Sequence, residues 1–260
     1  MKTFKKSLSV VLAALMLICA AIPAFAAEEI TVSLRVEGIE KCLFYGDVSV
    51  AKDATAFDAL KAAADKDESL TLTTTESQYG IYLAAINDLY AGSQTEKGWD
   101  GWMFRVNDEA ISVSMDQYTV KADDRVVVYY SDEYGETGML YPVADTSKLA
   151  DGKLSFTSTV TEYDANWNMT EKEVVITGAT LIWDGEKLTA DENGVYTIPF
   201  MKLLGSEHNV QLERYAENKL PNVLRFAPDY TLKVEHTNIL AKLLTFFVDL
   251  FAKVRALFVK

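Results

Sequence analysis

The residues of this chain that are best suited to chemistry are aromatic rather than nucleophilic, and they gather in one part of the sequence. Tyr79 and Tyr82 lie three positions apart, and Trp99 and Trp102 stand in the stretch KGWDGWMFRVN at 97–107. Aromatic rings stack on flat or sugar-like ligands, and their hydroxyl and N–H groups add hydrogen bonds. The pattern therefore indicates a binding surface rather than a catalytic centre.

Each of these residues also has a structural explanation, because aromatic side chains fill protein cores. In the strand-like stretch WMFRV, alternation places Trp102 on the face expected to be buried, with Arg105 and Asn107 on the opposite face. Trp99 lies in a loop between two glycines, where binding and packing both stay open. The two tyrosines could stand at a pocket rim or pack across strands. We predict a ligand site made of Tyr79, Tyr82, Trp99, Trp102, Arg105 and Asn107.

Motifs for catalysis and metal binding are missing from the sequence. His208 and His236 are its two histidines, they belong to different segments, and neither has cysteines or clustered carboxylates at metal-ligand spacing. The sequence has no G-x-S-x-G, H-E-x-x-H or phosphate-cradling glycine motif. We therefore expect that the protein is not an enzyme, has no metal site and uses no cofactor.

The first 26 residues predict export from the cell. They combine three lysines, an apolar run and an Ala-Phe-Ala exit, a combination typical of a secretory signal peptide. The apolar run is shorter than the roughly 20 residues that a membrane anchor needs. Without this segment only Cys42 remains, so the fold must depend on buried cores and not on an internal disulfide. We expect a secreted protein associated with the cell surface.

The chain is acidic, with 38 Asp and Glu against 25 Lys and Arg and a net charge of −13. Because nucleic-acid phosphates are bound by clustered Lys and Arg, nucleic acid is not an expected partner. Residues 27–235 hold 18 bases against 37 acids, whereas residues 236–260 hold four bases and one acid. Polar positions in this last segment recur at helical spacing. They predict an amphipathic helix that docks on a membrane surface, on a protein partner or on its own body.

Hydrophobic periodicity gives the order of elements in the first part of the chain. In residues 30–36 and 42–50, apolar and polar residues alternate, as in half-buried strands. In residues 54–67, apolar residues recur every three or four positions, which predicts a helix with Thr55 as its N-cap. Further strands follow up to residue 131. One helix among several strands is an α+β pattern, in which the helix lies across a mixed sheet.

The amino-acid composition and the pattern of apolar residues change after residue 131. Residues 132–152 are rich in Gly, Asp, Ser and Thr and read as a linker, and 153–235 is strand after strand between short polar turns. The predicted fold is α+β, with a β-grasp-like domain at 27–131, a small all-β sandwich at 153–235 and a C-terminal amphipathic helix at 236–260.

Several features within residues 30–131 also occur together in a known family. They are the helix opened by Thr55, an aromatic-Gly-x-Tyr at 79–82, an Ile-Asn-Asp turn at 86–88, the strand centred on Trp102 and a Tyr-x-Val-x-x-x-Asp hairpin at 118–124. In this order they resemble the C-terminal β domain of the transcobalamin and intrinsic factor family. They resemble more closely a bacterial secreted domain of unknown function from Gram-positive surface proteins. The resemblance implies a β-grasp-like fold that, in the animal carriers, closes over one face of cobalamin.

The animal carriers hold the other face of cobalamin in a helical barrel, for which this sequence has no counterpart. We predict a secreted bacterial binding protein that captures a corrinoid such as cobalamin, or another small ligand. The alternative is a non-catalytic structural or adhesive surface protein whose C-terminal helix docks on a membrane or a partner.

Overall fold

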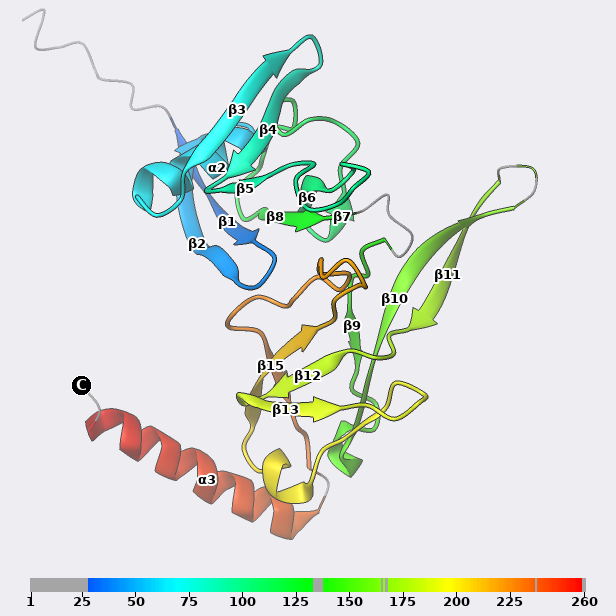
Figure 1. The fold of residues 1–260 in the computed structure, drawn as a ribbon. Helices are drawn as coiled ribbons and strands as arrows, with labels where there is room; N and C mark the ends of the chain where they lie inside the picture. The colour runs from blue at the N-terminus through cyan, green and yellow to red at the C-terminus, as the bar shows by residue number, and fades with distance from the viewer. Residues whose placement is uncertain (1–27, 133–137, 165, 167, 237, 259–260) are drawn as a thin grey trace, which may run out of the picture.

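The computed structural model describes residues 28–132, 138–164, 166, 168–236 and 238–258. The predicted signal peptide at 1–26 lies outside these residues, so export stays a prediction. The described residues form two α-helices and four β-sheets, whose arrangement Figure 1 shows. Two separate hydrophobic cores hold them together. The boundaries predicted for the domains also stay a prediction.

The first half of the chain builds two sheets and one helix. Its elements are β1 (Glu29–Glu37), β2 (Cys42–Ala51), α2 (Ala56–Lys66), β3 (Leu72–Ser77), β4 (Gly80–Ile86), β5 (Leu89–Tyr90), β6 (Gly101–Val106), β7 (Glu109–Ala110) and β8 (Arg125–Ser131). A five-stranded sheet has the order β2-β1-β8-β6-β7, with β1 and β8 parallel and the other pairs antiparallel. Strands β3, β4 and β5 form an antiparallel sheet of their own.

Helix α2 begins where its sequence predicts. The Thr55 hydroxyl accepts a hydrogen bond from the Asp58 N–H at 3.2 Å, and the Asp58 carboxylate accepts one from the Thr55 N–H at 2.8 Å. This reciprocal capping box satisfies two backbone donors that a helix start would leave unpaired. Beyond the cap, Ala56, Phe57, Ala59, Leu60 and Ala63 are buried, on the side that packs against β1 and β2.

The second half of the chain builds two four-stranded sheets and the second α-helix. Its elements are β9 (Val143–Asp145), η1 (Leu149–Asp151), β10 (Lys153–Tyr163), β11 (Met169–Val175), β12 (Thr180–Trp183), β13 (Glu186–Thr189), β14 (Tyr196–Thr197), η2 (Phe200–Leu203), β15 (Glu207–Glu213), β16 (Thr231–Lys233) and α3 (Ile239–Phe258). In one sheet β10 pairs with β11, β14 and β9, and the other has the order β13-β12-β15-β16.

Large aromatic side chains fill the second core. Phe156, Trp183 and Tyr196 are at most 1 % exposed. The Trp183 indole donates a hydrogen bond to the Lys202 carbonyl at 2.8 Å, and the Tyr196 hydroxyl donates one to the Ala179 carbonyl at 2.8 Å. Because their polar atoms have partners, these rings are buried without the cost of an unsatisfied donor.

The predicted fold class, α+β with a β-grasp-like domain and a small sandwich, is wrong. The described chain is mostly β, with four sheets and two α-helices. The helix does lie against a mixed sheet, but not all of the strands that follow it join that sheet, because β3, β4 and β5 form a separate one. The sequence pattern marks strands but not their partners, because pairing is decided by contacts between distant segments.

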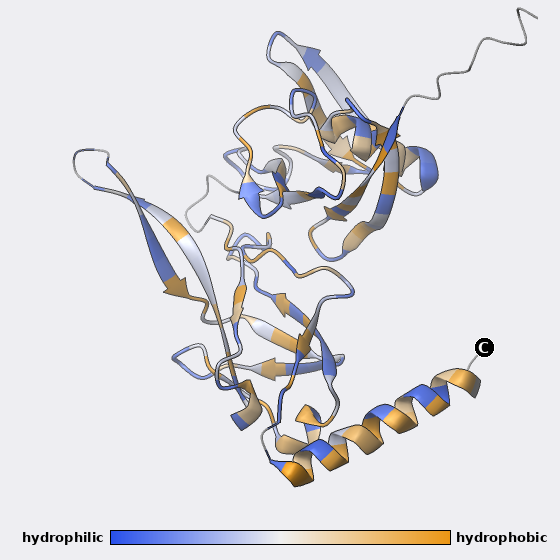
Figure 2. Cartoon of the chain, turned by 180° about the vertical axis from the view of Figure 1, so that it is seen from behind, coloured by the Kyte–Doolittle hydropathy of each residue, from blue (hydrophilic) through white to orange (hydrophobic). Residues whose placement is uncertain are grey.

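The predicted C-terminal helix is confirmed as α3, which extends from the second core with mostly hydrophobic residues along its length (Figure 2). Among the described residues, no helix is both long enough and apolar enough to cross a membrane.

Candidate functional site

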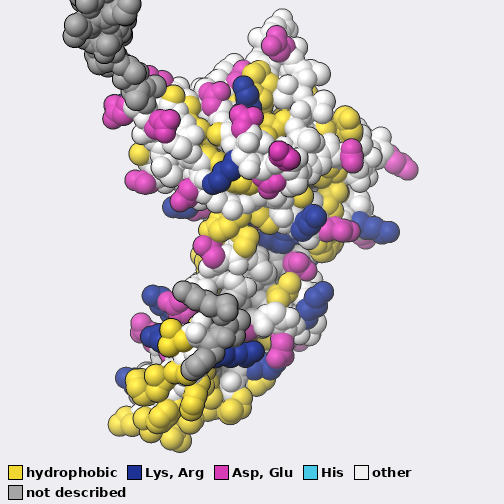
Figure 3. Space-filling model, turned by 90° about the vertical axis from the view of Figure 1, so that its left-hand side faces the viewer, with side chains coloured by type: hydrophobic (Ala, Val, Ile, Leu, Met, Phe, Trp, Pro, Cys, Tyr) yellow, Lys and Arg dark blue, Asp and Glu magenta, His cyan; other side chains and the backbone are white. Residues whose placement is uncertain are grey.

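A cleft of about 760 Å³ lies between the two cores. Small-ligand sites usually measure about 300–1,000 Å³, so the cleft has a suitable size. Strands β1, β2, β6 and β8 line it from the first half, and residues 141–144, 159, 224–227, 229 and 230 line it from the second. The waist between the two halves of the molecule is visible in Figure 3.

Positive charge gathers in this cleft although the chain as a whole is acidic. The charged side chains that line it are four arginines, Arg35, Arg105, Arg125 and Arg225, and two aspartates, Asp108 and Asp229. The whole chain carries a net charge of −13. A locally positive, partly desolvated cleft attracts anions far more strongly than an open surface does.

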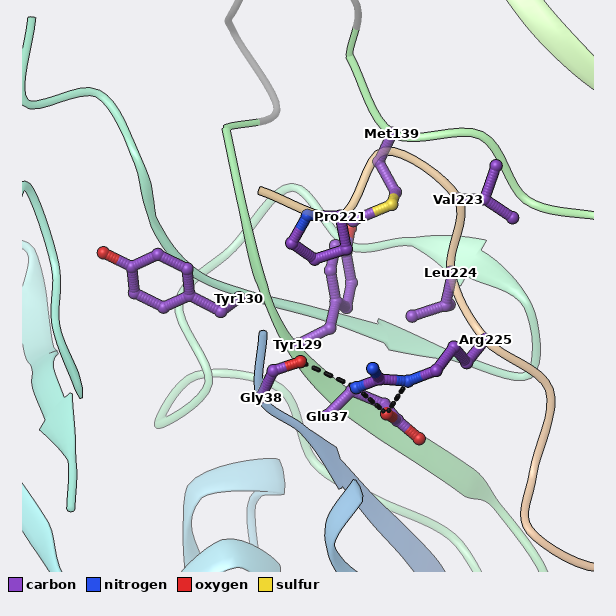
Figure 4. Close-up of a pocket in the computed structure, with 9 residues that line it drawn as sticks. All are labelled: Glu37, Gly38, Tyr129, Tyr130, Met139, Pro221, Val223, Leu224 and Arg225. Carbon is purple, nitrogen blue, oxygen red and sulfur yellow. Dashed lines mark hydrogen bonds and ion pairs between the residues drawn. The ribbon is translucent and has the colours of Figure 1, made fainter. Parts of the chain in front are cut away.

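A buried ion pair joins the two cores at the edge of the cleft. Two nitrogens of the Arg225 guanidinium donate to one carboxylate oxygen of Glu37, at 3.0 and 2.7 Å, and the guanidinium also reaches the Gly38 carbonyl at 2.8 Å (Figure 4). Both side chains are less than 10 % exposed. The pocket drawn there measures about 10 Å³, which suffices for a single water molecule. This point is therefore a junction and not a ligand site.

A second arginine shares the same carboxylate. Arg35 donates a hydrogen bond to the Arg225 carbonyl at 2.7 Å and lies 3.7 Å from the Glu37 carboxylate. Burial lowers the pKa of Arg35, and the negative charge of Glu37 acts in the opposite direction. Two buried guanidinium groups thus share one buried carboxylate. Since buried charge is costly unless it is compensated, this junction favours an additional anion in the cleft.

Aromatic side chains form the apolar part of the cleft. The Arg105 guanidinium lies over the Tyr141 ring, 3.7 Å from its centroid, in a cation–π contact. Phe226 and Tyr230 stack with centroids 4.1 Å apart and planes 7° apart. A ligand with a flat apolar body would find both stacking surfaces and cations here.

A hydrogen bond links the two halves on another side of the cleft. The Tyr45 hydroxyl of β2 donates to the Asp229 carboxylate at 2.6 Å. This bond to Asp229 raises the pKa of Tyr45 to about 12, and desolvation adds to the shift. Tyr45 therefore stays protonated at neutral pH and continues to donate to Asp229.

The structure places three of the predicted site residues on open surface. Tyr79 is 75 % exposed, Tyr82 is 55 % exposed and Trp99 is 58 % exposed. Tyr79 lies in the turn that joins β3 to β4, Tyr82 on β4, and Trp99 in the loop before β6. Lys97 lies 5.3 Å from the centroid of the Trp99 ring. An exposed ring in this setting is free to stack on a ligand.

The other three predicted residues have different surroundings. Trp102 packs on the first core, donates its N–H to the Leu89 carbonyl at 3.0 Å and meets Tyr130 edge to face. Asn107, with a φ of +52°, closes the turn after β6, where its amide donates to Asp124 at 2.8 Å. Arg105 lines the cleft. Of the six residues, all within the described chain, Arg105 belongs to the cleft lining and the other five do not.

Asp100 fixes the loop that carries Trp99. Its carboxylate accepts hydrogen bonds from the backbone N–H groups of Gln94 at 2.9 Å and Thr95 at 3.0 Å, and from the Tyr130 hydroxyl. Burial opposes ionisation of this carboxyl, but the hydrogen bonds from Thr95, Tyr130 and Gln94 outweigh it and lower its pKa. The Trp99 loop is therefore held in place by a buried anion.

Sequence reasoning missed most of the cleft, including Arg35, Tyr141 and Arg225. Arg35 gave no local signal, because in the alternating strand ITVSLRV it occupies the polar face with Thr31 and Ser33, as an ordinary solvent-facing residue would. No pattern links Glu37 to Arg225, since 188 positions separate them.

The two histidines lie in different places in the described part of the chain. No group of three or more His, Cys, Asp and Glu side chains there could hold a metal ion. His208 stacks on Trp183 and contacts Asp184 at 2.7 Å, whereas His236 contacts the Leu203 carbonyl at 3.0 Å. Both histidines are less than 10 % exposed, which is typical of structural roles.

Two solved structures are similar to part of the chain. One is haptocorrin in complex with Cbi, at 20 % identity and a TM-score of 0.37, over 40 % of this chain and 25 % of that chain. The other is a candidate metal-binding protein from Ruminococcus gnavus ATCC 29149, at 14 % identity and a TM-score of 0.29, over 39 % of this chain and 95 % of that chain.

The matched region thus spans a quarter of the haptocorrin chain. No curated protein matches this sequence. Residues 53–132 match the family model described as "Domain of unknown function (DUF4430)", which agrees in its coarser form with the resemblance to a bacterial domain of unknown function.

Proposed function

We propose that this protein binds a small ligand in the cleft between its two cores and does not transform it. The observation that carries the proposal is the junction at which Arg35 and Arg225 share the single carboxylate of Glu37 beside a cleft of about 760 Å³. A buried excess of positive charge favours an anionic group, and the Tyr141 ring and the Phe226–Tyr230 stack favour a flat apolar body.

The resemblance to the transcobalamin family makes cobalamin the first ligand to test. Cobalamin combines a flat macrocycle with an anionic phosphodiester, and cobinamide has the macrocycle without that phosphodiester. The pair therefore separates the two features that the cleft is proposed to recognise. The signal-peptide pattern at 1–26 supports the accompanying proposal that the protein is exported and acts at the cell surface.

A thermal-shift screen tests the proposal without a prior choice of ligand. Compounds that carry an anionic group and an aromatic or macrocyclic body, including cobalamin, are added to the full chain and to Arg105→Ala. We expect some of them to raise the melting temperature of the parent protein and to lose this effect in the variant, because bound ligand stabilises the folded state. A screen in which no compound stabilises the parent protein, or in which the variant responds equally, contradicts the proposal.

The second candidate is a structural or adhesive surface protein, and the exposed apolar helix α3 favours it. If this candidate is right, no compound in the same screen raises the melting temperature of the parent protein, and the protein acts by docking through α3.

A further inference from the structure

Helix α3 turns its polar side toward the protein and its apolar side toward solvent. Ala241 is buried, and Thr245 and Asp249 are half-buried, at a spacing of four residues that places them on one face of the helix. The Ser206 N–H donates to the Asp249 carboxylate at 3.1 Å, and the Gly205 N–H donates to the Thr245 hydroxyl at 3.5 Å. A narrow stripe of small and polar side chains thus fixes the helix to the second core.

The outward face is made of large apolar side chains. Its exposed residues are Ile239, Leu240, Leu243, Phe246, Phe247, Leu250, Phe251, Val254 and Leu257, which are between 42 and 83 % exposed. A helix that packs on its own domain buries its apolar stripe, whereas α3 does the reverse. Hydrophobic side chains gather at the α3 end of the molecule in Figure 3. An exposed apolar surface of this kind marks an interaction site.

Basic side chains flank the apolar face. At 100° per residue, Lys242 and Lys253 lie on one side of the helix and Arg255 on the other, and all three are exposed. The one acid within α3, Asp249, lies on the side that faces the protein body. The exposed surface of the helix therefore combines apolar side chains with positive charge only.

We propose that α3 docks lengthwise in the interface of a membrane whose surface carries anionic lipids. A helix of 20 residues is about 30 Å long and would place its Phe and Leu side chains among the acyl chains and its basic side chains at the phosphates. A second copy of the chain fits less well, because two α3 helices packed face to face would bring cations together with no outward carboxylate to pair with them. Four charged residues, Lys242, Asp249, Lys253 and Arg255, lie along α3, which favours a position in the interface over one across the membrane.

Vesicle flotation tests this docking with the full chain. Vesicles of phosphatidylcholine with phosphatidylglycerol are compared with vesicles of phosphatidylcholine alone. We expect the protein to float with the anionic vesicles and less with the neutral ones. The variant F247Q/F251Q/L257Q removes three exposed apolar side chains, and we expect its bound fraction to fall about tenfold or more. The variant K242Q/K253Q/R255Q should lose the preference for anionic vesicles.

The matched control is V113Q/M169Q/M201Q, which replaces three exposed apolar side chains outside α3 and should float like the parent protein. Two results would overturn the proposal. In one, the parent protein stays at the bottom of the density gradient with both vesicle types. In the other, F247Q/F251Q/L257Q floats as well as the parent protein. A dimer seen by sedimentation without lipid, lost in the α3 variant and accompanied by no flotation, would assign the face to a second copy instead. No residue of α3 lines the cleft, so a protein that does not bind vesicles would overturn the docking proposal without contradicting the proposed ligand site.

Discussion

Arg225 of the second core and Glu37 of the first lie almost entirely out of water and hold each other through two hydrogen bonds to one oxygen. Arg35 adds a second guanidinium to the same carboxylate. Arg35 and Glu37 both lie on β1, whereas Arg225 comes from a segment 188 positions after Glu37, and each charge needs the others to be buried at low cost. The junction therefore serves two purposes: it joins the cores and it leaves positive charge at the cleft.

Replacement of Arg225 by methionine tests the structural part of this account. The change leaves the Glu37 carboxylate buried beside Arg35 alone, and we expect the free energy of unfolding to fall by about 3–5 kcal/mol in urea denaturation. The matched control is Arg125→Met, which breaks the exposed ion pair of Arg125 with Asp108 and should cost less than about 1 kcal/mol. Equal losses in the two variants would mean that the junction does not stabilise the fold.

Asp100 makes the stability of the Trp99 loop depend on pH. Because its pKa is lowered in the folded protein, its stabilising effect is complete above the unfolded value of about 4 and disappears as the pH falls through the folded value. Asp100→Asn should lower the free energy of unfolding by about 1–3 kcal/mol at pH 7. The difference from the parent protein should shrink below about pH 4. Melting curves from pH 7 to pH 3 measure it, and a pH-independent difference would contradict the assignment.

At the scale of elements, the sequence predicts those features that depend on contacts between neighbouring residues. The capping box of Thr55 and Asp58 and the alternating pattern of β1 and β2 could be predicted, because each depends on neighbours within a few residues. The parallel pairing of β1 with β8 joins positions about 90 residues apart. The separate β3-β4-β5 sheet likewise follows from tertiary packing. The sequence pattern could not specify either one.

Gly80 shows how closely the β3–β4 hairpin approaches the rest of the first half. Its φ is +111°, and a Cβ there would lie 2.6 Å from the Asp116 carboxylate and 2.7 Å from the Ser114 hydroxyl. Gly80→Ala should therefore lower the free energy of unfolding by about 2–3 kcal/mol, because the backbone is strained and both side chains must move.

The matched control for that change is Gly178→Ala. Gly178 also has a positive φ, +69°, but a Cβ there meets nothing within 4 Å. Its substitution should cost about 1–2 kcal/mol from backbone conformation alone. Denaturation of the two variants side by side separates crowding from backbone strain, and a larger loss at Gly178 would contradict the contact seen at Gly80.

At the scale of the whole molecule, charge is divided between regions with different roles. The body is strongly acidic, whereas the cleft and the exposed side of α3 are positive. The basic tail could be predicted from the sequence because its basic residues lie within one short segment, 236–260. The cleft could not, because its four arginines are spread between positions 35 and 225 and are brought together only by the fold.

Calorimetric titration of cobalamin and of cobinamide into the full chain tests the central claim most directly. Arg105→Ala changes the cleft, and Trp99→Ala changes an exposed aromatic residue outside it. The account predicts saturable heat with cobalamin, weaker binding of cobinamide, and a loss of affinity of about tenfold or more in Arg105→Ala but not in Trp99→Ala. Binding that is lost in Trp99→Ala and kept in Arg105→Ala would place the site on the exposed loop. The absence of heat with either corrinoid would contradict corrinoid capture in the cleft.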